Sequence, residues 1–264
     1  MKKTVPKTAL ITGASSGIGA AFAHRLASKG YNLVLVARRK ENLTMLTRAL
    51  EQQYGITARF IVADLSCRDG IELAASAVKQ QGHFDMLVNN AGFGTTGMFV
   101  NCAMKKHHDM VYVHVLASMH LIRAALPLMI AHGSGAIINV ASLAAFIPMP
   151  GSVAYCATKS CLVAFSEALQ IELISTGIKV QVLCPGYTYT EFHDTPEFSS
   201  FNRSNIPRPL WSSTDTVVNA SLNALDQKQV ICIPGLVNRF IVSLARNSVT
   251  GPFIKALAKR GRVA

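Results

Sequence analysis

Short, nearly uninterrupted apolar segments alternate with longer segments of helical periodicity along most of this chain. Continuous apolar runs are typical of parallel strands that are covered on both faces. Their alternation with helices predicts right-handed crossovers and a doubly wound, seven-stranded parallel sheet, an α/β fold in a single domain. The expected strands are Thr8–Thr12, Asn32–Ala37, Ala58–Ala63, Phe84–Asn89, Gly135–Ala141, Lys179–Cys184 and Gln229–Ile233, and the expected helices begin near Ile18, Lys40, Arg68, Lys105, Ser152 and Thr214.

The composition agrees with a large buried core. The 264 residues are 50% hydrophobic and 15% charged, below the roughly 25% charged residues that are usual in soluble domains. This apolar content excludes a disordered chain, and we find no repeat that would indicate a solenoid. Residues 124–158 contain no Asp, Glu, Lys or Arg, but their prolines and glycines favour a buried strand between two packed helices over a membrane span.

The six cysteines show no spacing that suits a metal site. We therefore expect no metal and interpret the cysteines as small buried residues in a reducing compartment, which predicts a cytoplasmic protein. The apolar stretch that follows Met1 is interrupted by Pro6, Lys7 and several glycines. It is therefore not interpreted as a signal peptide.

A glycine-rich turn follows the first expected strand and precedes a helix. Glycines let the backbone approach a phosphate closely, and the free N–H groups of the next helix attract the anion. Tight packing alone produces a similar composition, so the position of the turn between strand and helix is what favours nucleotide binding. The candidate residues are Thr12, Gly13, Ser15, Ser16, Gly17, Ile18 and Gly19.

The end of the second strand indicates which nucleotide would bind. An NAD site usually has an acidic residue here for the ribose 2′-hydroxyl. This chain has Arg38 and Arg39 instead, which favours the 2′-phosphate of NADP(H). Arg38 is the preferred candidate because it follows the strand directly. The alternative is an ordinary solvated helix start.

Three residues could perform acid–base chemistry. Tyr155 and Lys159 are four positions apart and therefore share one helix face. A nearby ammonium favours phenolate, so we expect Lys159 to lower the pKa of Tyr155. Ser142, after the fifth strand, could hydrogen-bond a carbonyl or an alcohol. The alternative is an exposed helix turn, although a single lysine after a long uncharged stretch needs a partner.

Together these motifs resemble the short-chain dehydrogenase/reductase family over residues 8–233, with its Rossmann fold. The resemblance implies that Tyr155 donates a proton to a substrate carbonyl, Ser142 orients that carbonyl, and Lys159 binds the nicotinamide ribose. The nicotinamide supplies the hydride. Further matches to the cofactor site are Asp64, Leu65, Asn90, Ala91, Gly92, Pro185, Gly186, Thr188 and Thr190.

The chain departs from the family pattern at His114. The family usually has an asparagine in this register, where it supports a water-linked proton relay to the lysine, and here the register carries a histidine. We treat His114 as a candidate catalytic residue that could hold a water through a ring nitrogen. It could equally interrupt the relay, or be a core histidine without a role.

The segment after Gly186 should close over the substrate. Its phenylalanines and Trp211 indicate a hydrophobic carbonyl compound, such as a lipid-like ketone, a 3-oxoacyl chain or a steroid-like ring. The alternative is that these aromatic side chains only pack the segment onto the domain. Predicted boundaries place a catalytic domain at residues 1–235 and a basic helical extension at residues 236–264.

The extension suggests several partners. The formal net charge is +12, and no acidic residue follows Asp226. The extension could cover the substrate pocket, bind a second subunit or rest on an anionic membrane, and Gly251–Pro252 should divide it into two helices. Nucleic-acid binding is not expected, because no recognition motif is present. The helix 152–176 is apolar on more than one face and must be buried on both. The family resemblance implies that this helix and its predecessor pair across a two-fold axis, in a homodimer or homotetramer.

The favoured function is therefore an NADP(H)-dependent reductase or dehydrogenase. Two other readings remain: an NADPH-binding regulatory protein with weak or no catalysis, which the departure at His114 motivates, and a membrane-surface protein whose extension dominates its function.

Overall fold

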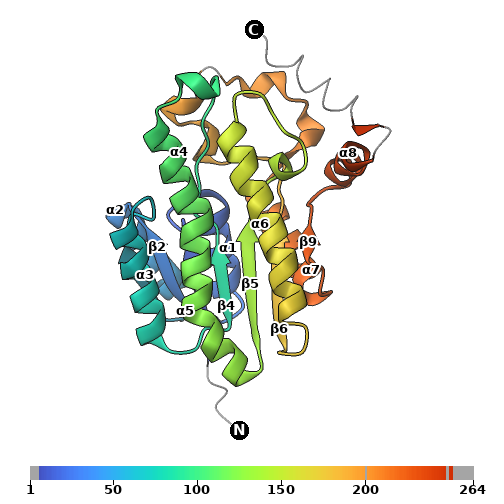
Figure 1. Ribbon diagram of the computed structural model, residues 1–264. Coiled ribbons are helices and arrows are strands. Elements are labelled where there is room, and N and C mark those ends of the chain that lie inside the picture. Colours follow the sequence, from blue (N-terminus) through green and yellow to red (C-terminus); the bar gives the residue numbers. More distant parts are fainter. Residues whose placement is uncertain (1–5, 200, 248–249, 252–264) are drawn as a thin grey trace.

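The computed structural model describes residues 6–199, 201–247 and 250–251. A parallel seven-stranded sheet with the order β3-β2-β1-β4-β5-β6-β9 forms its centre, as predicted (Figure 1). The strands differ from the predicted ranges by at most two residues at an end. They are β1 (Thr8–Thr12), β2 (Asn32–Ala37), β3 (Ala58–Val62), β4 (Met86–Asn89), β5 (Gly135–Val140), β6 (Ile178–Leu183) and β9 (Ile231–Cys232).

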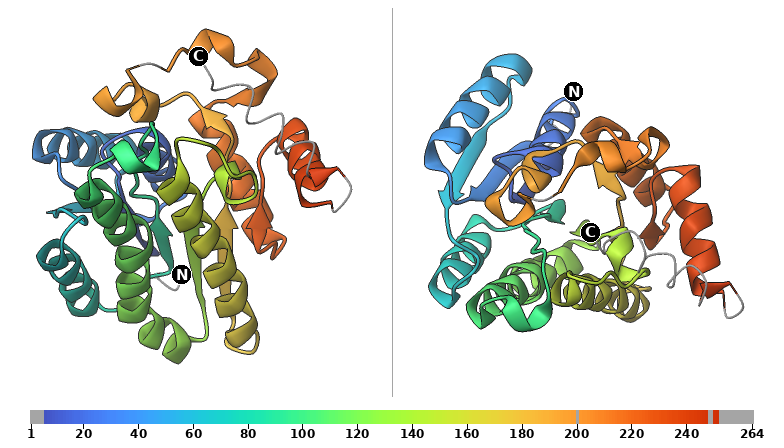
Figure 2. Two further views of the ribbon diagram at one scale, coloured as in Figure 1. Left: turned by 45° about the horizontal axis from the view of Figure 1, so that its top comes forward. Right: turned by 90° about the horizontal axis from the view of Figure 1, so that it is seen from above.

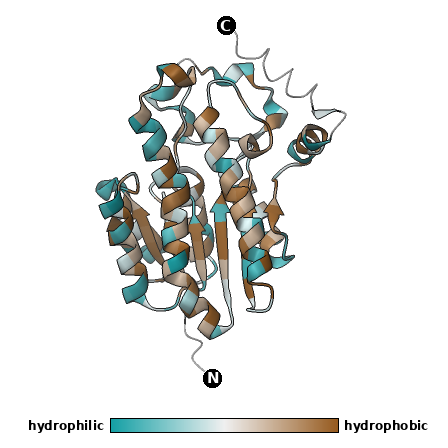
Figure 3. Ribbon diagram, viewed as in Figure 1, coloured by the Kyte–Doolittle hydropathy of each residue, from teal (hydrophilic) through white to brown (hydrophobic). Residues whose placement is uncertain are grey.

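Helices cover both faces of this sheet and enclose two apolar cores (Figure 1). One face carries α3 (Arg68–Gln81), α5 (Ala117–His132) and α6 (Val153–Glu172), and the other carries α1 (Gly17–Ala27), α2 (Lys40–Tyr54) and α7 (Thr214–Asp226). Figure 3 shows the strands as hydrophobic along most of their length. This double coverage explains why their sequences lack the alternation of a half-exposed sheet.

A long helical rod passes close to the carboxyl ends of the strands. In it α4 (Met104–Val111) continues through a π-helical segment, η2 (Tyr112–Leu116), into α5. Met104–His132 is long and apolar enough to cross a membrane, but 56% of its most apolar window is buried in the protein. A core helix passes the same test, so this is weak evidence for a membrane span. Residues 124–158 form a buried strand between packed helices, as predicted.

The segment expected to close over the substrate lies above the carboxyl ends of the strands (Figure 2). We call residues 187–212 the lid. Its ends, β7 (Tyr187–Thr188) and β8 (Trp211–Ser212), pair as a small parallel sheet that the sequence analysis did not predict. Between them are four short 3₁₀ turns: η4 (Glu191–His193), η5 (Pro196–Phe198), η6 (Arg203–Asn205) and η7 (Arg208–Leu210).

The extension begins with α8 (Leu236–Arg246), which packs onto the domain through Asn238, Val242 and Ala245. Leu236 and Phe240 are exposed on the same helix. The predicted second helix after Gly251–Pro252 falls at residues 252–264, outside the described residues. The proposed membrane contact of the extension therefore stays a prediction.

The cysteines follow the prediction only in part. Cys156, Cys184 and Cys232 are buried, whereas Cys67 and Cys161 are exposed on helix ends or outer faces and Cys102 is half-buried. A cysteine side chain is small enough to be tolerated at the protein surface. The residue type therefore did not show which of the six cysteines are buried. Within the described ranges, no group of three or more His, Cys, Asp or Glu side chains could hold a metal ion.

Candidate active site

Ser142, Tyr155 and Lys159 come together at the carboxyl end of β5, as the sequence analysis predicted. Ser142 follows that strand, and its hydroxyl hydrogen-bonds the phenol of Tyr155. Lys159 lies one turn after Tyr155 on α6, with its Nζ 5.6 Å from the centre of the Tyr155 ring. The same Nζ donates to the carbonyl of Val140 at 2.9 Å. The three side chains therefore form one group, in which Lys159 is buried and Ser142 and Tyr155 are half-buried.

The electrostatics of this group differ from the prediction. Burial raises the pKa of Tyr155 to about 12, and the hydrogen bond from Ser142 only partly offsets it. Burial also lowers the pKa of Lys159 to about 7. The expected depression of the Tyr155 pKa by Lys159 is therefore wrong for this structure: desolvation by burial is the largest cause of the shift, and Ser142, not Lys159, is the group that lowers the pKa. The phenol is protonated at neutral pH.

His114 lies in the π-helical segment beside these residues, with its ring edge-on to the Tyr155 ring at 5.7 Å. Its Nε2 accepts the N–H of Phe93 at 3.2 Å. Its Nδ1 lies 2.8 Å from the hydroxyl of Thr158. That hydroxyl donates to the carbonyl of Tyr155 at 3.0 Å. π-Helical turns inside α-helices frequently occur at functional sites, and this one turns His114 toward the catalytic helix.

These bonds define the protonation of His114. An Nε2 that accepts a backbone N–H carries no proton, so the neutral ring donates from Nδ1 to Thr158. Burial, and next the charge of Lys159, hold the pKa of His114 well below its ordinary value. Both ring nitrogens have protein partners, so the expectation that one of them holds a water does not fit this geometry. His114 instead joins the loop after β4 to α6.

The glycine-rich turn packs against the loop that follows β4. A Cβ on Gly13 would lie 2.8 Å from Cα of Ala91 and 2.9 Å from the amide of Asn90. The hydroxyl of Thr12 accepts the N–H groups of Asn90 and Ala91 at 2.9 and 3.0 Å. Thr12, Gly13 and Asn90 thus hold two loops together at the sheet edge. Close packing explains these residues directly, alongside any nucleotide contact.

Arg39 reaches this turn, and Arg38 does not share its hydrogen bonds there. The guanidinium of Arg39 donates to the hydroxyls of Ser15 and Ser16, at 3.1 and 2.7 Å from Nη2. Arg38 is exposed and lies close enough to Asp64 to lower the pKa of that carboxyl. The preference for Arg38 as the partner of a 2′-phosphate stays a prediction, and Arg39 is the arginine that contacts the glycine turn. The position of an arginine after a strand does not show whether its side chain folds back onto the glycine turn.

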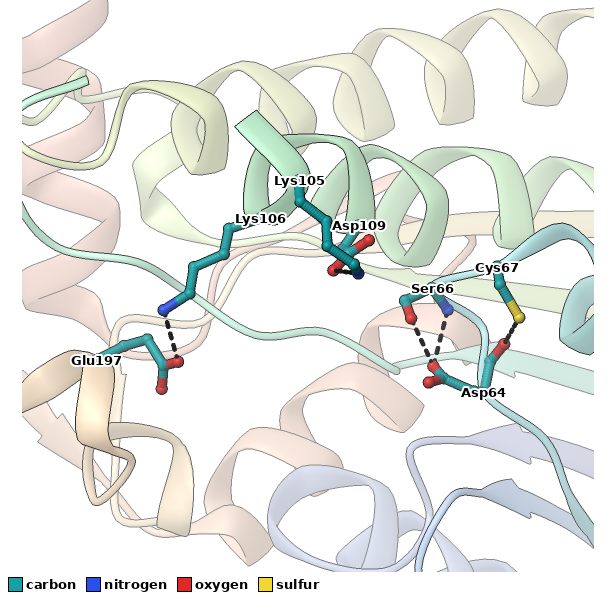
Figure 4. Close-up of polar contacts among 7 residues, drawn as sticks. All are labelled: Asp64, Ser66, Cys67, Lys105, Lys106, Asp109 and Glu197. Atoms are coloured by element: carbon teal, nitrogen blue, oxygen red, sulfur yellow. Dashed lines mark hydrogen bonds and ion pairs between the residues drawn. The ribbon is translucent and has the colours of Figure 1, made fainter. Parts of the chain in front are cut away.

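Asp64 stands at the end of β3, where Figure 4 shows its carboxylate beside Ser66. Partial burial acts to raise the pKa of Asp64, but hydrogen bonds from the backbone and hydroxyl of Ser66 lower it overall. Asp64 is therefore ionised at neutral pH. The neighbouring Leu65 is buried in the core under α3, and Ile18 of α1 is half-buried against the other core.

The segment after β6 leads from the catalytic group to the lid. The carbonyl of Pro185 accepts the N–H of Leu143, which fixes it beside Ser142. A Cβ on Gly186 would lie 2.7 Å from the amide of Asn238, so α8 packs directly onto this segment. Thr188 and Thr190 hydrogen-bond within the segment, and the hydroxyl of Thr190 caps η4. The sequence analysis did not identify Asn238.

The lid covers the catalytic group with aromatic side chains. The ring of Phe192 lies 5.9 Å from that of Tyr155 and 5.3 Å from that of Phe198. Both phenylalanines rest on Gly94, where a Cβ would approach their rings to 2.9 and 2.8 Å. Gly92 similarly lies under His114 and Lys159. Glycines at positions 92 and 94 therefore make room for the catalytic side chains and for the lid.

Tyr155, the buried Lys159 and Ser142 thus lie together at one edge of a doubly wound sheet, and the glycine turn with its arginines lies at the same edge. Residues 7–197 match the sequence profile of the short chain dehydrogenase family. The chain belongs to this family.

Similar proteins agree with that assignment. Ketoacyl reductase HetN of Nostoc sp. is 35% identical over 226 residues, covering 84% of this chain and 76% of that protein. A short-chain dehydrogenase of Sphingobium yanoikuyae in complex with NADPH has a TM-score of 0.82 and 33% identity, with 89% and 91% of the two chains covered. An alcohol dehydrogenase of Comamonas testosteroni specific for bulky-bulky ketones has a TM-score of 0.78 and 31% identity, with 94% and 95% covered.

Proposed function

We propose that the protein is an NADPH-dependent reductase that converts a carbonyl group of a hydrophobic substrate to an alcohol. The observation that carries this proposal is the grouping of Tyr155 with Ser142 and Lys159 beneath an aromatic lid. A phenol that keeps its proton at neutral pH is suited to donate it.

The residues present fit a nicotinamide nucleotide. The N-terminus of α1 and the serine hydroxyls of the glycine turn offer donors to a pyrophosphate. Arg38 and Arg39 at the end of β2 offer guanidinium groups to a 2′-phosphate, which favours NADP(H) over NAD(H). The NADPH in the Sphingobium neighbour supports the same preference. When bound, the nicotinamide supplies the hydride that reduces the carbonyl carbon.

The protein's own residues position and protonate the substrate. The hydroxyl groups of Ser142 and Tyr155 lie within hydrogen-bond distance of each other, so a carbonyl oxygen that enters between them would accept a hydrogen bond from each. Tyr155 gives its proton to that oxygen as negative charge develops on it. Lys159, buried beside the ring, stabilises the resulting phenolate when it is protonated.

We assign His114 a positioning role in this mechanism. It fixes the backbone of Phe93 and, through Thr158, the turn of α6 that carries Tyr155. This places the loop after β4 and the catalytic helix in one hydrogen-bonded unit.

The substrate is proposed to be a bulky, apolar ketone or 3-oxoacyl compound. Phe192 and Phe198 present apolar ring surface immediately above Tyr155. A polar substrate would lose hydration there without gaining partners from these rings. The Nostoc protein, a ketoacyl reductase, and the Comamonas protein, an alcohol dehydrogenase specific for bulky-bulky ketones, support this class.

We further propose a homo-oligomer formed through α5 and α6. The outward face of α6 exposes Val153, Cys161 and Ile171, an apolar surface that a second subunit would cover. Phe165 of the same helix is half-buried and packs against the core of its own subunit.

A substrate panel tests the proposed activity. Purified protein is mixed with NADPH or NADH and with medium-chain 3-oxoacyl thioesters, steroid ketones, aromatic ketones or short sugars, and alcohol formation is measured by mass spectrometry. The proposal predicts alcohol products from the bulky apolar carbonyls, with NADPH preferred. Reduction of the sugars alone, or no product with any carbonyl compound, would contradict it.

A further inference from the structure

Arg39 holds the glycine turn and the lid together at the proposed phosphate site. Its Nε and Nη2 both donate to the hydroxyl of Ser15, at 3.2 and 3.1 Å, and Nη2 also donates to Ser16 at 2.7 Å. Its Nη1 forms an ion pair with Glu191 at 2.9 Å. Glu191 belongs to η4, the first turn of the lid, 152 positions away in the sequence. One guanidinium therefore spans two loops.

A second contact places the same part of the lid on the glycine turn. A Cβ on Gly17 would lie 3.1 Å from Cγ2 of Thr190, the residue that precedes Glu191. Gly17 also has a φ of +56°, a conformation that favours glycine. The first lid turn thus lies against the backbone that begins α1, and the ion pair between Arg39 and Glu191 attaches this turn to the glycine turn.

We propose that Glu191 is a specificity-determining residue that competes with the 2′-phosphate of NADPH for Arg39. This inference rests on the proposed function. A phosphate binds a guanidinium through paired N–H donors, and Glu191 already occupies one of these donors, Nη1, so the two anions compete for Arg39. Binding of the 2′-phosphate to Arg39 has to displace Glu191, whereas NADH carries a hydroxyl at this position and does not require the displacement.

The displacement also links the nucleotide to the lid. When Arg39 turns to the phosphate, the first lid turn loses its ion pair with the glycine turn. The next lid turn, η5, stays attached, because its Glu197 pairs with Lys106 of α4 at 3.0 Å (Figure 4). The hydroxyl of Thr96 also donates to the carbonyl of Glu197 at 2.6 Å. NADPH therefore releases one edge of the lid while the other edge stays fixed.

The size of the effect follows from the exposure of the pair. The side chains of Arg39 and Glu191 are 45% and 60% exposed, and exposed ion pairs contribute little. We expect Glu191→Gln to lower the Kd of NADPH by about two- to fivefold. The Kd of NADH should stay unchanged, because its 2′-hydroxyl does not compete with a carboxylate for the arginine.

The experiment measures the Kd of NADPH and of NADH, by nucleotide fluorescence, for the full-length wild type and its variants. Glu197→Gln is the matched control, since it removes a lid carboxylate whose ion pair is with α4 and not with the glycine turn. We expect this control to leave the ratio of the two Kd values at its wild-type level. Glu191→Gln should raise the preference for NADPH by two- to fivefold.

A second pair of variants separates competition from simple charge repulsion. If Glu191 acts by occupying Arg39, then Glu191→Gln should change nothing in a protein that already carries Arg39→Gln. A persistent gain in NADPH affinity there, or an equal gain for NADPH and NADH in the single variant, or no gain at all, would overturn the inference alone. Failure of the wild type to bind either nucleotide would overturn the proposed function, and this inference with it.

Discussion

Replacing Lys159 with methionine should stabilise the folded protein at neutral pH while abolishing its activity. Lys159 is only 4% exposed, and burial lowers its pKa from 10.5 to about 7. Between these two values the unfolded chain binds more protons than the folded protein does. The free energy of unfolding of the wild type therefore rises with pH through this window, and the destabilising effect of Lys159 is fully present below about pH 7.

The magnitude follows from the same two values. A pKa lowered from 10.5 to about 7 corresponds to a cost of roughly 4–5 kcal/mol at pH 7 and roughly 2 kcal/mol at pH 9. The methionine variant also loses the hydrogen bond to the carbonyl of Val140, worth about 1–3 kcal/mol at either pH. The stability advantage of Lys159→Met should consequently shrink by about 2 kcal/mol between pH 7 and pH 9.

Urea unfolding of wild type and Lys159→Met at pH 7 and pH 9, at constant ionic strength, measures this change. Lys29→Met, which removes an exposed lysine, controls for the loss of one positive charge. A difference between wild type and Lys159→Met that stays the same at both pH values would refute the reasoning, because it would mean that the ammonium is not desolvated by folding.

Two further substitutions test the surroundings of the catalytic group. His114→Leu leaves the N–H of Phe93 without its acceptor and should lower the free energy of unfolding by about 1–3 kcal/mol in a urea titration. His114→Asn serves as the polar comparison. Wild-type stability, turnover and pH profile in both variants would exclude a positioning role. Gly94→Ala should force the rings of Phe192 and Phe198 to move. It should raise KM for a bulky ketone by roughly three- to tenfold and leave the Kd of NADPH unchanged. A fall in kcat at constant KM would contradict this prediction.

The fold was predictable because its strands are buried on both faces. Segments such as Asn32–Ala37 have five buried residues in succession, so the continuous apolar run in the sequence matches the burial directly. The two-residue strands β7 and β8 could not be found this way. They are too short to carry a periodic pattern, and they pair across more than twenty residues of irregular chain.

The catalytic group was partly predictable for a similar reason. Helical spacing alone places Tyr155 and Lys159 on one face of α6, and strand ends place Ser142 near them. Spacing says nothing about desolvation, so the direction of the Tyr155 pKa shift was predicted wrongly.

The partners of His114 and of Arg39 come from distant parts of the sequence. Thr158 is 44 positions from His114, and Glu191 is 152 positions from Arg39. A usable signal for Glu191 was present, since acidic residues are rare in this basic chain and this one begins the segment over the nucleotide turn. The pattern of charges along the sequence does not show which basic residue forms an ion pair with Glu191.

The central claim is that the phenol of Tyr155 protonates the substrate carbonyl. The most direct test is a single-turnover measurement of NADPH oxidation with a bulky aromatic ketone, comparing wild type with Tyr155→Phe after both have been shown to bind NADPH with the same Kd. Loss of the proton donor should slow the oxidation by about 10²- to 10⁴-fold. A Tyr155→Phe variant that turns over within a fewfold of the wild-type rate would contradict the account.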